Sequence, residues 1–238
     1  ALFALSSMAL AFDLQGHRGA RGLAPENSLA AFEIALQHGV TTLELDIAIT
    51  RDGVLVVHHD LALNPDTTRD AAGRWLDAPS APIHTLSWAE LQTYDIGRLK
   101  PGTRYASLYP QQRPIDGTRI PRLVDLFDAV KRSGHDEVRF AIETKLSPLQ
   151  PAATLAPEPY ARALVHEIRK AGMQERVQIL SFDWRTLAVV QRIAPGIPTV
   201  YLTAQQRWLD NIGADRAEGS AWTAGVQYCD HGSVPKMI

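Results

Sequence analysis

Residues 41–60 read TTLELDIAITRDGVLVVHHD, and this stretch carries the strongest indications of both the fold and the chemistry. From residue 43 to residue 50, aliphatic residues alternate with Glu44, Asp46, an alanine and a threonine. An alternation of period two is typical of a β-strand, whose successive side chains point to opposite faces. The pattern therefore predicts a strand that carries Glu44 and Asp46 on one face.

A tight turn is predicted directly after this strand. Asp52 and Gly53 favour a type I′ turn because both tolerate a positive φ, and the run VLVV after them predicts a second strand. If these two residues form the whole loop, Asp46 lies opposite His59 with Cβ atoms roughly 5 Å apart, and His58 falls on the aliphatic face. A three-residue loop would reverse the assignment of the two histidines.

The face that carries Glu44 and Asp46 has two interpretations. Carboxylates on an alternating strand most often face solvent. A histidine on the same face favours a functional interpretation, because two carboxylates and an imidazole suit an oxygen-preferring divalent cation with an acid/base group beside it.

Composition limits the class of protein. The chain has 238 residues, of which 45% are hydrophobic and 21% charged, so it can bury a sizeable core, and we expect one domain with an insertion. Its formal net charge of −2 gives the protein no overall positive potential that would attract nucleic acid. We therefore expect no nucleic-acid partner and only local phosphate recognition. The single cysteine, Cys229, excludes an internal disulfide framework and a cysteine-rich zinc site.

The first residues resemble part of a secretion signal. Residues 1–11, ALFALSSMALA, form a short apolar run that ends in small residues, as in the remnant of a signal peptide. The run is too short to span a membrane, so we expect no stable membrane anchor. The alternative is a first buried strand or helix of the fold. The signal-peptide interpretation predicts a periplasmic or secreted protein.

Strand patterns alternate with helix patterns along the rest of the chain. A short strand leads into His17, and a helix capped by Asn27 or Ser28 follows it. Further strands are predicted at 137–145, 177–182 and 198–203, with helical patterns between them. This alternation predicts a parallel sheet with right-handed crossovers. The sheet is either open or closed as a (β/α)₈ barrel, the TIM barrel.

Charged residues occupy the carboxyl ends of the predicted strands, where barrels of this kind place their reactive groups. Glu143 and Lys145 project from one face of their strand. They could form a pair on an exposed edge, but the hydrophobic residues before them favour a buried strand, in which charge is costly unless it has a function. His17, Glu44 and Asp46 fit the same position.

Two features depart from a simple barrel. Residues 61–120 are rich in proline, glycine and polar residues and predict an inserted lobe, which either shapes a substrate cleft or has no contact with the chemistry. Only five strands are apparent, whereas a complete barrel takes roughly 250 residues. We therefore expect a barrel that is truncated before its last strands.

The motifs in this chain resemble those of the glycerophosphodiester phosphodiesterase family. They are GHRG at 16–19, PENS at 25–28, LELDIAITRDG at 43–53, VVHHD at 56–60 and ETK at 143–145. The resemblance implies a TIM barrel like that of phosphatidylinositol-specific phosphodiesterases. It places the domain at residues 12–238, with 61–120 as the insertion and the carboxyl-terminal part incomplete.

The resemblance also implies roles for individual residues. Glu44, Asp46 and Glu143 correspond to metal ligands, His17 and His59 to an acid/base pair, and Arg18 and Lys145 to phosphate-binding cations. Three carboxylates offer a hard oxygen site, which suits one divalent cation, Ca²⁺ or Mg²⁺.

The function implied is metal-dependent hydrolysis of a small glycerophosphodiester to an alcohol and glycerol 3-phosphate. Two alternatives remain open at this point. The first is a phospholipase-type phosphodiesterase that acts on lysophospholipid or sphingolipid. The second is an inactive fragment that binds phosphate without hydrolysis.

Overall fold

A computed structural model describes residues 12–216 and 218–238 of the chain. The predicted signal-peptide remnant at 1–11 lies outside the described residues. Within the described part, no helix combines the length and the apolar character that crossing a bilayer requires.

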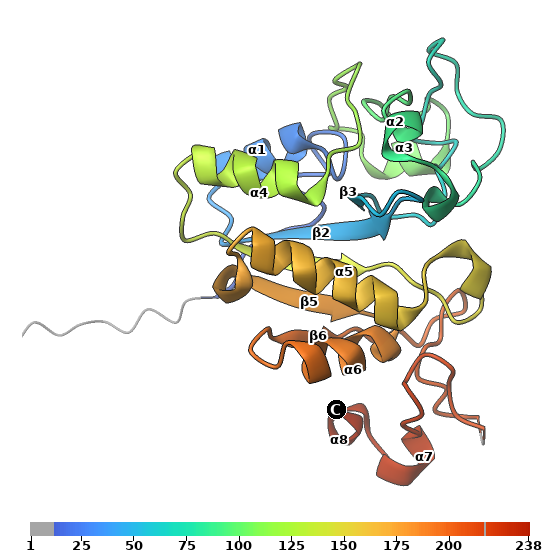
Figure 1. Cartoon of the computed structure of the whole chain (residues 1–238). Coiled ribbons are helices and arrows are strands. Elements are labelled where there is room, and N and C mark those ends of the chain that lie inside the picture. Colours follow the sequence, from blue (N-terminus) through green and yellow to red (C-terminus); the bar gives the residue numbers. More distant parts are fainter. Residues whose placement is uncertain (1–11, 217) are drawn as a thin grey trace, which may run out of the picture.

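A single mixed sheet runs through the molecule (Figure 1). Its strands are β1 (Gln15–Gly16), β2 (Thr42–Ile49), β3 (Leu55–Val57), β4 (Arg139–Thr144), β5 (Val177–Ser181) and β6 (Thr199–Tyr201). The order β1-β2-β4-β5-β6 is parallel throughout, while β3 is antiparallel to β2. The predicted α/β class and the five parallel strands are therefore confirmed. Hydrogen bonds do not close the sheet into a ring within the described residues, and the expected truncation stays a prediction.

Helices connect the parallel strands. The connecting helices are α1 (Leu29–Gln37), α4 (Leu123–Arg132), α5 (Pro157–Lys170) and α6 (Trp184–Ile193). The shorter helices α2 (Trp88–Leu91) and α3 (Arg104–Leu108) lie in the 61–120 segment, α7 (Tyr228–His231) and α8 (Val234–Met237) follow β6, and short 3₁₀ turns lie at 83–85, 151–153 and 174–176. Ser28 caps α1, its hydroxyl accepting a hydrogen bond from the Ala31 N–H, and Asp183 caps α6. In Figure 1, α4, α5 and α6 follow one another along the sheet, in the order of β4, β5 and β6.

The alternation in β2 separates two buried environments. Leu43, Leu45 and Ile47 pack with α4 and α5 in the main hydrophobic core. Glu44 and Asp46 point to the opposite face and are also buried, with 7% and 1% of their surface exposed. The solvent-facing interpretation of this strand is therefore wrong, because both of its faces are covered.

The predicted two-residue turn between β2 and β3 is wrong. The ladder pairs Ile47 with Val57, Ala48 with Val56 and Ile49 with Leu55. The Thr50 N–H then donates to the Val54 carbonyl at 3.0 Å, which leaves a loop of three residues, 51–53. Gly53 has a φ of 80°, whereas Asp52 does not adopt the left-handed conformation that a type I′ turn requires.

Contacts with the lobe account for this loop. The Asp52 carboxylate accepts hydrogen bonds from the Thr50 hydroxyl at 2.6 Å and from the Trp88 N–H at 3.0 Å. The Arg51 N–H donates to the Leu86 carbonyl at 2.9 Å. Two of these three partners lie more than thirty residues along the chain, so local turn preferences do not decide the loop length.

The change of register affects both histidines. The His58 N–H donates to the Asp46 carbonyl at 2.9 Å, so His58 and not His59 continues the ladder beside Asp46. The predicted position of His58 on the aliphatic face is therefore wrong, because its ring is buried beside Glu26 and Asn27. Because β3 ends at Val57, the chain turns there and still delivers His59 to the cleft described below.

The segment 61–120 packs against the hairpin. Leu63, Ile83, Leu91 and Ile96 form a second hydrophobic cluster with Ala48 and Val56 of the hairpin. The predicted helical turn after Ser87 is α2, which is closed by a reciprocal capping box between Ser87 and Glu90. The lobe thus has a core of its own that includes side chains from β2.

Asp13 joins the amino-terminal ends of three strands. Its carboxylate accepts hydrogen bonds from the Thr41 and Thr42 hydroxyls, both at 2.6 Å, from the Gln15 amide at 2.8 Å and from the Arg139 guanidinium at 2.9 Å. Partial burial acts to raise the pKa of Asp13, but these four donors outweigh it and lower the pKa from 3.8 to about 2.

The Asp13→Ala variant is therefore expected to be less stable at pH 7, by on the order of 1 kcal/mol for a partly exposed ionic group. A carboxyl with a lowered pKa stabilises the folded state above its unfolded pKa, and that contribution is lost as the pH falls from about 4 through about 2. Urea unfolding of both proteins between pH 7 and pH 2 measures the difference. A difference that stays constant down to pH 2 would contradict this role.

Candidate active site

The sheet brings the predicted site residues to one end of the strands. His17 follows β1 directly, and Lys145 follows β4. Asp46 in β2 pairs in register with Glu143 in β4, and Glu44 lies two residues before Asp46 on the same face. All five residues meet at the carboxyl ends of adjacent parallel strands, as the barrel prediction requires.

Three carboxylates form the centre of the site. One oxygen each of Glu44, Asp46 and Glu143 lie within 4.8 Å of one another, and all three side chains are buried. Burial and the neighbouring charge of Asp46 raise the pKa of Glu44 to about 8, and burial also raises the pKa of Glu143. Buried carboxyl groups with raised pKa values fit a hard divalent cation, because the charge of the cation offsets the cost of burying the ionised carboxylates.

Two cations pair with these carboxylates. The Lys145 ammonium lies 3.0 Å from Asp46 Oδ1 and 2.5 Å from Glu143 Oε1, and the Arg18 Nε lies 3.2 Å from Asp46 Oδ2. Burial acts to raise the pKa of Asp46, but the charges of Lys145, His59 and Arg18 hold it below its usual range. Asp46 therefore stays ionised near neutral pH.

The backbone at Arg18 is bent to place this side chain. Arg18 has a φ of 52°, which is uncommon for a residue with a side chain, and its N–H donates to Glu44 Oε2 at 2.7 Å. Gly19 follows with a φ of 77°, and a Cβ there would come within 2.7 Å of the Ala31 backbone in α1. The glycine in the GHRG motif therefore allows the loop to approach α1 closely.

His17 lies at the rim of the carboxylate cluster. Its Nε2 is 3.8 Å from Glu44 Oε2, and 56% of its side chain is exposed. Partial burial together with the positive charges of Arg21 and Arg18 lowers the pKa of His17 to about 4. The imidazole is therefore neutral near pH 7 and can accept a proton.

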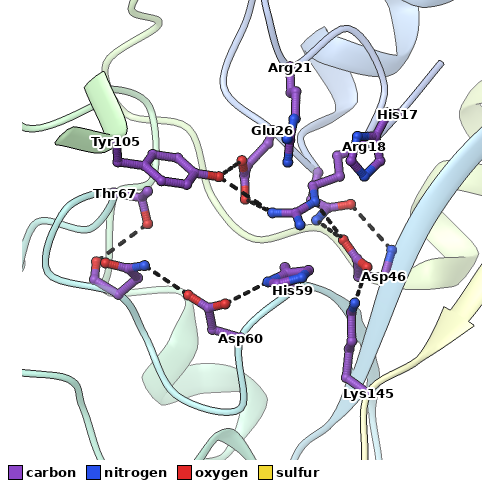
Figure 2. Close-up of polar contacts among 12 residues, drawn as sticks. His17, Arg18, Arg21, Glu26, Asp46, His59, Asp60, Thr67, Tyr105 and Lys145 are labelled. Carbon is purple, nitrogen blue, oxygen red and sulfur yellow. Dashed lines mark hydrogen bonds and ion pairs between the residues drawn. The ribbon is translucent and has the colours of Figure 1, made fainter. Parts of the chain in front are cut away.

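His59 is oriented by a neighbouring carboxylate. Its Nδ1 lies 2.6 Å from Asp60 Oδ1, and Asp60 also accepts a hydrogen bond from the Asn64 amide at 2.9 Å (Figure 2). A carboxylate at Nδ1 leaves Nε2 available for a reacting group. The structure thus places His59 in the site, although by a different route from the predicted pairing.

A cleft of about 780 Å³ lies over these residues. It is lined by His17, Arg18, Arg21, Glu44, His59, Asp60, Leu61, Glu143, Thr144, Lys145, Leu146, Leu180, Phe182, Leu202, Trp208, Leu209 and Trp222. The charged residues gather on the side of β1, β2 and β4, while apolar side chains from the segment after β5 form the other wall. Such a combination is typical of a small-molecule site.

The sequence interpretation missed several polar neighbours of the site. The Asn27 amide donates to Asp46 Oδ2 at 2.9 Å, Glu26 Oε1 accepts from Arg18 Nη1 at 2.7 Å, and the Tyr105 hydroxyl contacts Glu26 (Figure 2). Glu26 and Asn27 belong to the PENS motif, where they read as the start of a helix. Nothing in the local sequence of Tyr105 indicates that the lobe reaches the site.

Tyr105 provides a test of the lobe's contribution. Its hydroxyl contacts Glu26 and lies 3.4 Å from Arg18 Nη1, so it helps to orient the guanidinium. We expect Tyr105→Phe to raise the KM for a phosphodiester about 3- to 10-fold with a smaller change in kcat, because the loss of one hydrogen bond costs about 1 kcal/mol. Steady-state kinetics measure both constants. Tyr94→Phe, in the same lobe but outside the cleft, is the control, and equal effects from the two changes would contradict the assignment.

The profile of the glycerophosphoryl diester phosphodiesterase family matches residues 17–238. The chain is 28% identical to a glycerophosphodiester phosphodiesterase of Bacillus subtilis, over 88% of the chain and 66% of that protein. It is 31% identical to one of Caldanaerobacter subterraneus, over 75% of the chain and 61% of that protein. The chain therefore spans about two thirds of the length of these relatives.

Solved structures agree with this match. A protein from Silicibacter pomeroyi assigned as a glycerophosphoryl diester phosphodiesterase superposes with a TM-score of 0.77 at 35% identity, over 84% of this chain and 67% of the other. A phosphodiesterase from Oleispira antarctica, solved in complex with the product sn-glycerol-3-phosphate, superposes with a TM-score of 0.60 at 25% identity, over 83% and 69%. The chain belongs to the glycerophosphoryl diester phosphodiesterase family.

Proposed function

We propose that this chain hydrolyses glycerophosphodiesters to an alcohol and glycerol 3-phosphate with the help of a divalent cation. The observation that carries the proposal is the convergence of three buried carboxylates with two histidines and two cationic side chains in one cleft. The family of the chain and the product complex of the Oleispira antarctica relative support the choice of substrate.

Glu44, Asp46 and Glu143 are the residues that would hold the cation. Their oxygens form a hard donor set in which no sulfur or imidazole takes part, which favours Ca²⁺ or Mg²⁺. When bound, such an ion supplies Lewis-acid stabilisation of the negative charge on a phosphoryl group.

Arg18 and Lys145 are the residues that would hold the phosphate. Both line the cleft, and in the structure both pair with Asp46. A guanidinium and an ammonium can each donate to phosphoryl oxygens, and the guanidinium can do so in a bidentate manner. Their pairing with Asp46 fixes their positions before the substrate arrives.

His17 and His59 are the residues that would transfer protons. A neutral imidazole can deprotonate the attacking water or hydroxyl, while a protonated one can donate to the oxygen of the leaving alcohol. The low pKa of His17 suits the accepting role. Asp60 at His59 Nδ1 orients the ring and leaves Nε2 for the oxygen of the leaving alcohol, which suits the donating role.

Release of glycerol 3-phosphate from glycerophosphocholine tests the proposal. The chain is incubated with Ca²⁺, with Mg²⁺ and with a chelator, and the product is measured by a coupled assay. We expect turnover with at least one cation and its loss with the chelator. Equal turnover with the chelator would contradict the metal requirement, and no turnover under any condition would contradict the proposed activity.

The apolar wall of the cleft favours a second candidate substrate class. Phe182, Trp208 and Trp222 line the cleft opposite the charged residues, and 76% of the surface of Trp208 is exposed. An acyl chain would bury such a surface. Faster turnover of lysophosphatidylcholine than of glycerophosphocholine would favour this candidate, although only Leu61 of the lobe contributes to the apolar lining.

We also propose that the protein is exported, on the basis of the apolar run at residues 1–11. Fractionation of cells that produce the protein naturally tests this. We expect the protein in the periplasmic or extracellular fraction, and recovery with the cytoplasmic markers would contradict it.

A further inference from the structure

Arg21 lies in the wall of the cleft, and its only part so far is the effect of its charge on the pKa of His17. It lines the cleft together with His17 and Arg18, and its side chain is partly buried. Figure 2 shows it extending toward the loop that carries these two residues.

The charge of Arg21 is not neutralised as those of the other cleft cations are. Arg18 pairs with Glu26 and Asp46, and Lys145 pairs with Asp46 and Glu143. Within the described residues, no carboxylate forms an ion pair with Arg21. A partly buried guanidinium that faces a cleft without a carboxylate partner attracts an anion from solution.

The lobe holds Arg21 in place from the other side. The Arg21 guanidinium lies over the Tyr109 ring, 4.7 Å from its centroid, and Tyr109 packs edge-on against Tyr105. The Gln112 amide donates to the Arg21 carbonyl at 2.7 Å. A cation stacked on an aromatic face loses little further freedom when it binds an anion, and its N–H groups stay available.

We propose that Arg21, supported by Tyr109, forms an anion subsite beside the phosphate site and binds a negatively charged substituent on the alcohol part of a glycerophosphodiester. This inference rests on the proposed function and narrows its substrate class. A carboxylate or a phosphate monoester suits the planar guanidinium, which can donate two parallel hydrogen bonds to either. The subsite also gives the lobe at 61–120 a part in substrate selection.

Two substrates that differ by one carboxylate provide the test. Glycerophosphoserine is glycerophosphoethanolamine with a carboxylate added to the alcohol. We expect the wild-type chain to have a higher kcat/KM for glycerophosphoserine, and Arg21→Gln to lower the ratio of the two kcat/KM values about 10- to 100-fold, as expected for a hydrogen-bonded ion pair. Arg104→Gln is the matched control, since it removes the same charge from an exposed position on α3 outside the cleft.

Tyr109→Leu adds a second variant, because it removes the ring and keeps the charge. We expect it to lower the same ratio by a smaller factor than Arg21→Gln. An equal loss on both substrates in Arg21→Gln would overturn the inference, because Arg21 would then bind the scissile phosphate. Unchanged kcat/KM values for both substrates would overturn it as well.

Calorimetric titration with the two compounds separates this inference from the proposed function. If the wild-type chain hydrolyses neither compound but binds glycerophosphoserine more tightly through Arg21, the proposed function fails and the subsite stands. If wild type and Arg21→Gln bind both compounds equally, the subsite is overturned whatever the activity.

Discussion

Turnover of glycerophosphocholine by the His59→Ala variant is expected to fall about 10²- to 10⁴-fold, while the affinity for Ca²⁺ or Mg²⁺ stays within a few-fold of wild type. Positioned acid/base groups contribute rate factors of this size. His59 lies at the cleft with its Nδ1 bound to Asp60, and it is not a member of the carboxylate cluster. The substitution therefore removes proton transfer and leaves the cation site intact.

Steady-state kinetics and calorimetric metal titration on the same preparation measure the two effects. His135→Ala is the matched control, because His135 is exposed and lies outside the cleft. His58→Ala is expected to lower stability more than turnover, since the His58 ring is buried and does not line the cleft. If His58→Ala lost as much turnover as His59→Ala at full folding, the assignment of His59 would fail.

Divalent cations are expected to bind the Glu143→Gln variant at least about 100-fold more weakly. Loss of a residue that only hydrogen-bonds to a metal ligand typically lowers metal affinity about 10- to 100-fold. Loss of a ligand itself should lower the affinity by at least as much. Glu143 is one of three carboxylates whose oxygens converge within 4.8 Å, and glutamine retains its shape without its charge. In this variant the positive charge of Lys145 also offsets a larger share of the negative charge that is left to attract a cation.

Calorimetric titration with Ca²⁺ and with Mg²⁺ measures this loss. Glu137→Gln is the control, because Glu137 is exposed and precedes β4 by two residues. Thermal unfolding without added metal shows whether the variant is folded. Unchanged titration of a folded Glu143→Gln variant would remove Glu143 from the ligand set and leave the site to Glu44 and Asp46.

Much of the site could be predicted from the sequence because strand geometry is local. Alternation fixes which side chains share a face, and a parallel sheet gathers the ends of its strands. The positions of Glu44, Asp46 and Glu143 therefore follow from periodicity and strand order alone. The short strand that leads into His17 was also predicted and is β1 in the structure, while the acid/base role of His17 is implied only by the family motifs.

The polar neighbours of the site could not be predicted in this way. Tyr105 approaches Arg18 from 87 residues along the chain, and Arg21 is held by Tyr109 of the same lobe. No periodicity relates an irregular segment to a distant loop, because its position depends on how its own small core packs against the hairpin. The chemistry of these contacts is visible only in the folded molecule.

The sequence by itself determined the faces of β2 and β4, the start of α1 at Asn27 or Ser28 and of α6 at Asp183, and the meeting of Glu44, Asp46 and Glu143 at one end of the sheet, because hydrophobic period, capping and strand polarity act over a few residues. The tertiary structure alone decided the hairpin register and the route of His59. There, hydrogen bonds between residues 86–88 and the 51–53 loop outweigh the local preference of Asp52 and Gly53 for a two-residue turn.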